Sequence, residues 1–151
     1  FLPIQVDEAW SAQPADEERD WKRDIAGMHV LLVEDNEINF EIVEYMLQDA
    51  DAKVVTANDG KAAVDTFAAS APGTFDCVLM DLMMPVMSGY EATRVIRSLD
   101  REDAKTVPII ALSANTFEED IALAKDAGMN EHLAKPVDIN KMFRTMSQLR
   151  R

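Results

Sequence analysis

The sequence has one cysteine in 151 residues, so an internal disulfide is excluded. Cys77 lies in the apolar run CVLM (77–80), which is typical of a buried, unreactive thiol. Basic residues are also scarce, 15 against 28 acidic ones, and the net charge of −13 disfavours binding to nucleic acid or anionic lipid. No run approaches the roughly 18 apolar residues of a membrane span, and the first residues lack the order of a signal peptide. These absences favour a cytoplasmic domain without direct membrane contact.

The length and an apolar fraction of 48% fit one core-forming domain with an appendage. Residues 1–27 differ from the rest, because the polar stretch 5–24 contains Pro14 and a cluster of acids between residues 16 and 20. Such a composition predicts a linker. The sequence shows no internal repeat and no low-complexity tract.

From Met28 onward, short apolar runs alternate with amphipathic stretches. The apolar runs predict five strands, at residues 30–33, 54–56, 75–80, 107–112 and 132–134. Apolar residues three or four apart predict helices at 36–50, 61–70, 90–99, 117–127 and 140–149. Gly128 is predicted to cap the fourth helix, and Pro108 to open the fourth strand. Five such βα units predict an α/β fold whose parallel sheet is covered by helices on both faces.

Polar residues end four of the predicted strands: Glu34 and Asp35 the first, Asp81 the third, Ser113 the fourth and Lys135 the fifth. The carboxyl ends of parallel strands share one edge of the sheet, so these side chains are expected to converge there. Three neighbouring carboxylates repel one another unless a cation neutralises them, and an all-oxygen set suits Mg²⁺. We therefore predict a magnesium site at Glu34, Asp35 and Asp81. Lys135 fits such a site when a phosphoryl group also binds, because its ammonium pairs with phosphate oxygens.

Four segments resemble the receiver domain of two-component response regulators, particularly the receivers attached to hybrid histidine kinases. They are LLVEDNEIN (31–39), LMDLMMPVMSG (79–89), PIIALSAN (108–115) and LAKP (133–136). The resemblance extends from Met28 to about Leu149. It implies a flavodoxin-like, doubly wound (βα)5 fold with a five-stranded parallel sheet in the order 2-1-3-4-5.

The same resemblance implies roles for the acidic residues. Asp81 is the implied phosphoacceptor. The implied magnesium ligands are Glu34, Asp35, Asp81 and the backbone carbonyl of Met83. The cofactor expected for the domain is therefore Mg²⁺.

The remaining strand-end residues also receive roles from the resemblance. Lys135 is expected to contact the phosphoryl group, Pro136 to follow a cis peptide, and Ser113 to be the switch hydroxyl. His132 departs from the family pattern, because a tyrosine or phenylalanine usually stands three residues before this lysine. Either His132 is an ordinary, partly exposed strand residue, or it replaces the aromatic switch residue and turns inward when Ser113 shifts. Because histidine titrates near neutral pH, the second hypothesis makes the switch pH-dependent.

The leading functional hypothesis is a phosphoryl relay. Asp81 would take a phosphoryl group from a phosphohistidine and pass it to a histidine phosphotransfer domain or lose it to water. One alternative is an aspartyl-phosphate hydrolase of the haloacid dehalogenase type, which is disfavoured because Met83 stands where those enzymes carry a second aspartate. The other is an unphosphorylated docking module, which is disfavoured because the acidic, hydroxyl and lysine set is complete.

The N-terminal residues suggest the larger context. Residues 1–4 (FLPI) resemble the last strand of a histidine-kinase ATP-binding domain. We expect residues 1–27 to be the tail of an upstream kinase domain plus a linker, and residues 28–151 to be the receiver. The chain lacks a Gly-x-x-x-x-Gly-Lys-Ser/Thr loop, so it is not expected to be a kinase by itself. The expected donor is the phosphohistidine of a kinase dimerisation domain, and a membrane anchor elsewhere in the parent kinase stays open.

The predicted helix at 36–50 carries two apolar stripes, and one helix face cannot bury both. The second stripe contains Ile38, Ile42 and Tyr45. Either Ile42 and Tyr45 widen the buried face, or Ile38 and Tyr45 stay exposed near Asp81 and dock a four-helix partner bundle.

Overall fold

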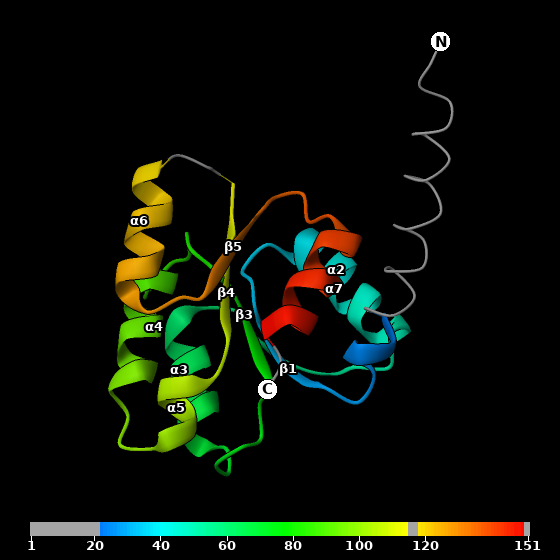
Figure 1. The fold of residues 1–151 in the computed structure, drawn as a ribbon. Helices are drawn as coiled ribbons and strands as arrows, with labels where there is room; N and C mark the ends of the chain where they lie inside the picture. Colours follow the sequence, from blue (N-terminus) through cyan, green and yellow to red (C-terminus); the bar gives the residue numbers. More distant parts are fainter. Residues whose placement is uncertain (1–21, 115–117, 150–151) are drawn as a thin grey trace.

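A computed structural model describes residues 22–114 and 118–149 of the chain. Five parallel strands form one sheet in the order β2-β1-β3-β4-β5, which confirms the predicted topology (Figure 1). The strands are β1 (His29–Val33), β2 (Lys53–Ala57), β3 (Cys77–Asp81), β4 (Ile109–Ser113) and β5 (Glu131–Ala134). The chain order reverses beside β1, where β2 lies on one side and β3 on the other. In doubly wound folds, ligands bind at this switch point.

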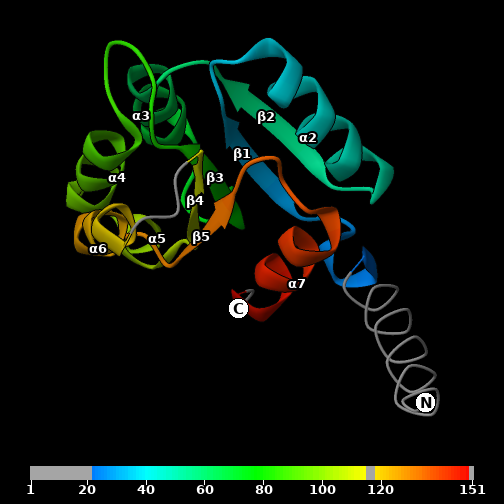
Figure 2. The same cartoon turned by 90° about the horizontal axis from the view of Figure 1, so that it is seen from above.

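Helices cover both faces of the sheet (Figure 2). They are α2 (Glu37–Asp49), α3 (Gly60–Ala69), α4 (Gly89–Ser98), α5 (Glu102–Thr106), α6 (Glu118–Ala127) and α7 (Ile139–Leu149). The first and last of them, α2 and α7, lie on one face, and the others lie on the opposite face. Side-chain caps begin four of these helices: Asn36, Asp59, Ser88 and Asp138 accept hydrogen bonds from backbone amides in the first turn of α2, α3, α4 and α7.

The sheet divides the buried side chains into two clusters. One cluster, beneath α3 to α6, includes Leu31, Phe67 and Ile96, and the other, beneath α2 and α7, includes Leu32, Leu47 and Phe143. Every residue of β3 and β4 is buried, as expected for central strands that helices cover on both faces. Burial of each large aliphatic side chain contributes roughly 1.5–3 kcal/mol, so the core holds the strand ends in a fixed arrangement.

The structure corrects the predicted elements at one helix and two strands. The helix α5 was not predicted, because its sequence EDAKT buries only Ala104 and is too short to show a helical period. The fourth strand begins at Ile109 rather than at residue 107, since Val107 is the C-cap of α5 and Pro108 only precedes the strand. The third strand likewise begins at Cys77 rather than at residue 75 and extends to Asp81.

The end of the predicted linker packs on the domain. Residues 22–25 are helical, and Ile25 is fully buried in the cluster beneath α2 and α7. Two polar contacts accompany this burial: the Ser147 hydroxyl donates to Asp24 at 2.6 Å, and Lys22 contacts Asp49 at 3.1 Å. The predicted origin of residues 1–27 stays a prediction, and residues 1–21 lie outside the described part of the chain.

The cysteine lies at the start of the central strand β3. Cys77 is 1% exposed, as its apolar sequence context predicts. Burial, together with the charge of the neighbouring Asp76, raises the pKa of Cys77 to about 12. The thiol is therefore protonated at physiological pH. Within residues 22–114 and 118–149, none of the helices has the length and apolar character needed to cross a membrane.

Candidate functional site

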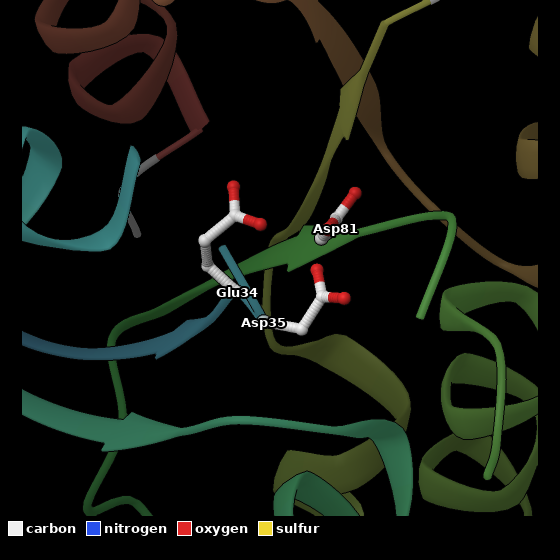
Figure 3. A group of neighbouring side chains, drawn as sticks. All are labelled: Glu34, Asp35 and Asp81. Atoms are coloured by element: carbon white, nitrogen blue, oxygen red, sulfur yellow. The ribbon is translucent and has the colours of Figure 1, made fainter. Parts of the chain in front are cut away.

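Three carboxylates meet at the carboxyl ends of β1 and β3 (Figure 3). Glu34 and Asp35 follow β1, and Asp81 is the last residue of β3, which pairs directly with β1. One oxygen atom from each carboxylate lies within 4.8 Å of the others. Glu34 and Asp81 are 2% and 3% exposed, whereas Asp35 is exposed. The convergence predicted from topology is therefore present.

Backbone contacts hold the glutamate in place. The Glu34 amide donates to the carbonyl of Ala57 at 3.1 Å, which continues the pairing of β1 and β2 by one residue. The Glu34 carboxylate accepts a hydrogen bond from the Asn36 amide at 3.2 Å. Asn36 in turn caps α2, so the helix start and the carboxylate share one turn. Sequence reasoning placed Asn36 inside the helix and missed this role, although asparagine directly before an amphipathic helix is typical of a cap.

Lys135 joins two of the three carboxylates. Its ammonium Nζ lies 2.9 Å from Glu34 Oε1 and 3.0 Å from Asp81 Oδ1. The Lys135 amide donates to the carbonyl of Ser113 at 2.8 Å, which fixes the end of β5 beside the end of β4. The peptide between Lys135 and Pro136 is cis, as the family resemblance implies. A positive charge thus lies where the sequence predicts a phosphoryl group.

The site changes the acidity of its own groups. Burial, together with the neighbouring Glu34 carboxylate, raises the pKa of Asp81 to about 7 despite the nearby ammonium. Burial alone would lower the pKa of Lys135, but its contacts with Glu34 and Asp81 outweigh burial and raise it. Lys135 is therefore fully charged at neutral pH. The Asp81 carboxylate carries an unfavourable charge that a cation or phosphorylation would relieve.

The loop between β3 and α4 closes tightly against Asp81. The Met83 amide approaches Asp81 Oδ1 at 3.3 Å, and the Gly89 amide donates to the carbonyl of Leu82 at 3.0 Å. A Cβ atom at Gly89 would collide with the backbone oxygen of Asp81, so only glycine allows this approach. Val86 within the loop has φ 69°, a left-handed conformation that is uncommon for a β-branched residue.

The other predicted site residues lie on β4, β5 and α2. Ser113 ends β4 and is 6% exposed. His132 lies in β5, with 26% of its side chain exposed and its Nδ1 3.9 Å from Glu131 Oε1. On α2, Ile38 is 69% exposed and Tyr45 is 70% exposed, so the second apolar stripe of the helix does not widen the core.

Fold and site together define a doubly wound α/β domain with an acidic cluster and a paired lysine at the carboxyl edge of its sheet. Known proteins share this combination. The sequence profile of the response regulator receiver domain matches residues 30–147. The chain therefore belongs to the response regulator receiver family, whose members are the phosphoryl-accepting domains of two-component phosphorelays.

The relatives agree with this assignment. Probable histidine kinase 2 of Oryza sativa subsp. indica is 42% identical over 127 residues, which cover 77% of this chain and 12% of that protein. The receiver domain of sensor histidine kinase PA1611 from Pseudomonas aeruginosa, solved with a magnesium ion in its active-site cleft, is 40% identical. It covers 82% of this chain and 98% of the solved chain, with a TM-score of 0.74.

A third relative was solved with a partner. The receiver domain of the response regulator Ssk1 from Saccharomyces cerevisiae, in complex with the histidine phosphotransfer protein Ypd1, is 30% identical with a TM-score of 0.73. The match covers 82% of this chain and 89% of that chain. The chain spans only a small share of the curated histidine kinases that it matches.

Proposed function

We propose that Asp81 accepts a phosphoryl group from a phosphohistidine and passes it to a histidine phosphotransfer domain or to water. The observation that carries this proposal is the ammonium of Lys135, held 3.0 Å from Asp81 beside a cluster of three carboxylates, two of which are buried. An Asp81 oxygen would attack phosphorus while the bond from phosphorus to the histidine nitrogen breaks. Phosphoryl transfer needs chiefly positioning and charge stabilisation, which this arrangement can supply.

The donor set fits Mg²⁺. Glu34, Asp35 and Asp81 offer hard oxygen ligands, and the exposed side of Asp35 leaves room for the waters that Mg²⁺ retains. In the proposal these residues and the backbone carbonyl of Met83 hold the ion. When bound, Mg²⁺ supplies charge that stabilises the phosphoryl oxygens. The magnesium-bound relative from Pseudomonas aeruginosa supports this assignment.

The proposal is tested by incubating the protein with a small acyl phosphate in two separate samples, one with Mg²⁺ and one with excess chelator. Label is expected on the peptide that contains Asp81, and only when Mg²⁺ is present. Ser113 would form a hydrogen bond to the attached phosphoryl group and so act as the switch hydroxyl. Label on another carboxylate would contradict the assignment.

We place the receiver in a hybrid histidine kinase, with residues 1–27 as the tail of the kinase domain and its linker and residues 28–151 as the receiver. The similarity to histidine kinases supports this context. A cytoplasmic location follows from the proposed donor, whose phosphohistidine is made from ATP. The net charge of −13 supports partners that are proteins rather than nucleic acids.

The proposed partner surface is the exposed stripe of α2. Ile38 and Tyr45 project from the helix that begins beside Glu34, so a protein seated there would lie close to Asp81. Replacing Ile38 by Glu is expected to slow phosphoryl transfer from and to protein partners about 10-fold or more, because a charge would enter an apolar contact. Transfer would be measured with a phosphorylated histidine phosphotransfer protein by following loss of its label.

The matched control is Leu123→Glu, which places the same charge on an exposed apolar position of α6, on the opposite face of the sheet. This variant should retain normal transfer. The Ile38 variant should also retain its melting temperature and its labelling by a small acyl phosphate. Equal loss of both labelling reactions would refute the docking role.

The proposed switch residue is His132. It lines a cavity of about 230 Å³ whose other residues are Ile121, Ala124, Lys125, Met129, Asn130 and Glu131. A protonated ring can be drawn toward the acidic, phosphorylated site, and the charged residues that line the same cavity are Lys125 and Glu131. The population of the active state should therefore depend on pH, and His132→Phe should reduce this dependence.

Nuclear magnetic resonance spectra with and without a phosphoryl mimic would measure the shift at each pH. His29→Gln is the control, because His29 is the other histidine of the chain and lies at the opposite end of the sheet, at the start of β1. The control should keep the pH dependence of the parent. If the His132 variant also keeps it, His132 is an ordinary surface residue.

A further inference from the structure

The turn that precedes α3 lies directly against the loop that follows Asp81. Gly60, the first residue of α3, has no room for a side chain. A Cβ atom there would collide with the carbonyl oxygen of Met87 and would lie 2.9 Å from its carbonyl carbon and 3.0 Å from its Cβ. Because most of this contact is with backbone, it cannot be relieved by turning a side chain.

Met87 belongs to a loop that has little freedom to move. At one end, the Gly89 amide donates to Leu82, and Gly89 itself abuts the backbone of Asp81. Within the loop, the Met87 amide donates to Pro85 at 2.7 Å, and Val86 has a left-handed backbone. A β-branched residue keeps that conformation only where its surroundings impose it. A displacement of Met87 would therefore be passed along the short loop toward Asp81.

We propose that Gly60 is a positioning residue for the magnesium site. Because Gly60 has no side chain, the Met87 carbonyl can lie against its backbone. This contact fixes the position of the loop, and the loop holds the backbone of Met83 beside Asp81. This inference rests on the proposed function, in which the Met83 carbonyl is a magnesium ligand. It assigns a role in phosphoryl transfer to a residue outside the acidic cluster.

The contact, rather than the backbone conformation, explains why glycine is needed here. Gly60 is not among the described glycines with positive φ, which are Gly27, Gly73 and Gly128. Its position is the first of a helix whose cap, Asp59, accepts a hydrogen bond from the Ala62 amide at 2.8 Å. Alanine at such a position normally stabilises a protein, because it restricts the unfolded chain. Without the contact, Gly60→Ala would therefore be neutral or stabilising.

The test compares Gly60→Ala with the parent protein by calorimetric titration with Mg²⁺, well below the melting temperature of both. Magnesium affinity is expected to fall about 10-fold, as it does when other supports of metal ligands are lost. Amide resonances of residues 81–89 should shift in the metal-free spectrum. At saturating Mg²⁺ the rate of labelling by acyl phosphate should recover toward the parent value.

Gly73→Ala provides the matched control. Gly73 has φ 82°, so alanine is strained there, yet nothing lies within 4 Å of its added Cβ. This variant should lower the melting temperature without changing magnesium affinity. A loss of stability alone therefore cannot reproduce the expected result for Gly60→Ala.

Unchanged magnesium affinity in Gly60→Ala would overturn the proposal. If that variant does not fold in buffer, it and the parent are both titrated in sucrose, which stabilises folded proteins, and equal magnesium affinities there would overturn the proposal. Titration of Asp81→Asn with Mg²⁺ separates failure of the proposed magnesium site from failure of the role proposed for Gly60. If Asp81→Asn binds Mg²⁺ as the parent does, the proposed site is wrong, whereas a loss confined to Asp81→Asn leaves the site intact and removes only the role of Gly60.

Discussion

Phosphorylation of the domain should disappear when Asp81 is replaced by Asn. An amide oxygen is a poor nucleophile compared with a carboxylate, and the substitution also removes a magnesium ligand while keeping the size of the side chain. Among the described carboxylates of the cluster, Asp81 and Glu34 are the two that have the Lys135 ammonium within 3.0 Å. Radiolabel from a phosphohistidine protein and from a small acyl phosphate would measure the loss.

Asp76→Asn is the matched control for this experiment. Asp76 immediately precedes β3 at the amino end of the same strand, and its side chain is 44% exposed. This variant should be labelled at the parent rate. Undiminished labelling of Asp81→Asn in the absence of magnesium would contradict both the acceptor and the metal assignments.

The same substitution is expected to stabilise the fold in magnesium-free buffer. The pKa of Asp81 is about 7 in the folded protein and about 4 in an unfolded chain, so folding disfavours the charged form. The stability that the protonated Asp81 carboxyl contributes is fully present below about pH 4 and is lost as the pH rises through 7. Asp81→Asn should therefore gain on the order of 2 kcal/mol at pH 8, or roughly 5–10 °C in melting temperature.

Thermal unfolding between pH 4 and pH 8 would measure this gain, which should shrink toward zero at the acidic end. Saturating Mg²⁺ should raise the melting temperature of the parent much more than that of Asp81→Asn, because the ion neutralises the same charge. Asp76→Asn again serves as the control and should respond to Mg²⁺ as the parent does. A loss of stability in Asp81→Asn at pH 8 would mean that the attraction of Lys135 outweighs burial and the repulsion from Glu34.

The sheet could be predicted because its central strands are buried on both faces. Continuous apolar runs such as Val30 to Val33 are typical of parallel strands that helices cover on both sides, and alternation with helices then leaves few topologies. The helix α5 could not be predicted, because its five residues bury one alanine and it is held by contacts distant in sequence. One such contact is the hydrogen bond from the Gly73 amide to Asp103.

The acidic cluster could also be predicted, since parallel topology brings the ends of β1 and β3 together whatever lies between them in sequence. The contact between Gly60 and Met87 could not. It joins two loops whose distance depends on how α3 and α4 pack, and residue spacing says nothing about that packing. The exposure of Ile38 and Tyr45 was one of two open alternatives, because periodicity gives the angle between two stripes but not the width of the helix face that the core covers.

Chemical modification of the buried cysteine can report unfolding of the domain. Since Cys77 is held in the central strand with a pKa of about 12, an alkylating reagent or peroxide meets almost no thiolate while the sheet is intact. Modification must wait for β3 to separate from its neighbours, which is an event as costly as global unfolding. The modification rate of this lone thiol therefore measures how often the whole domain opens.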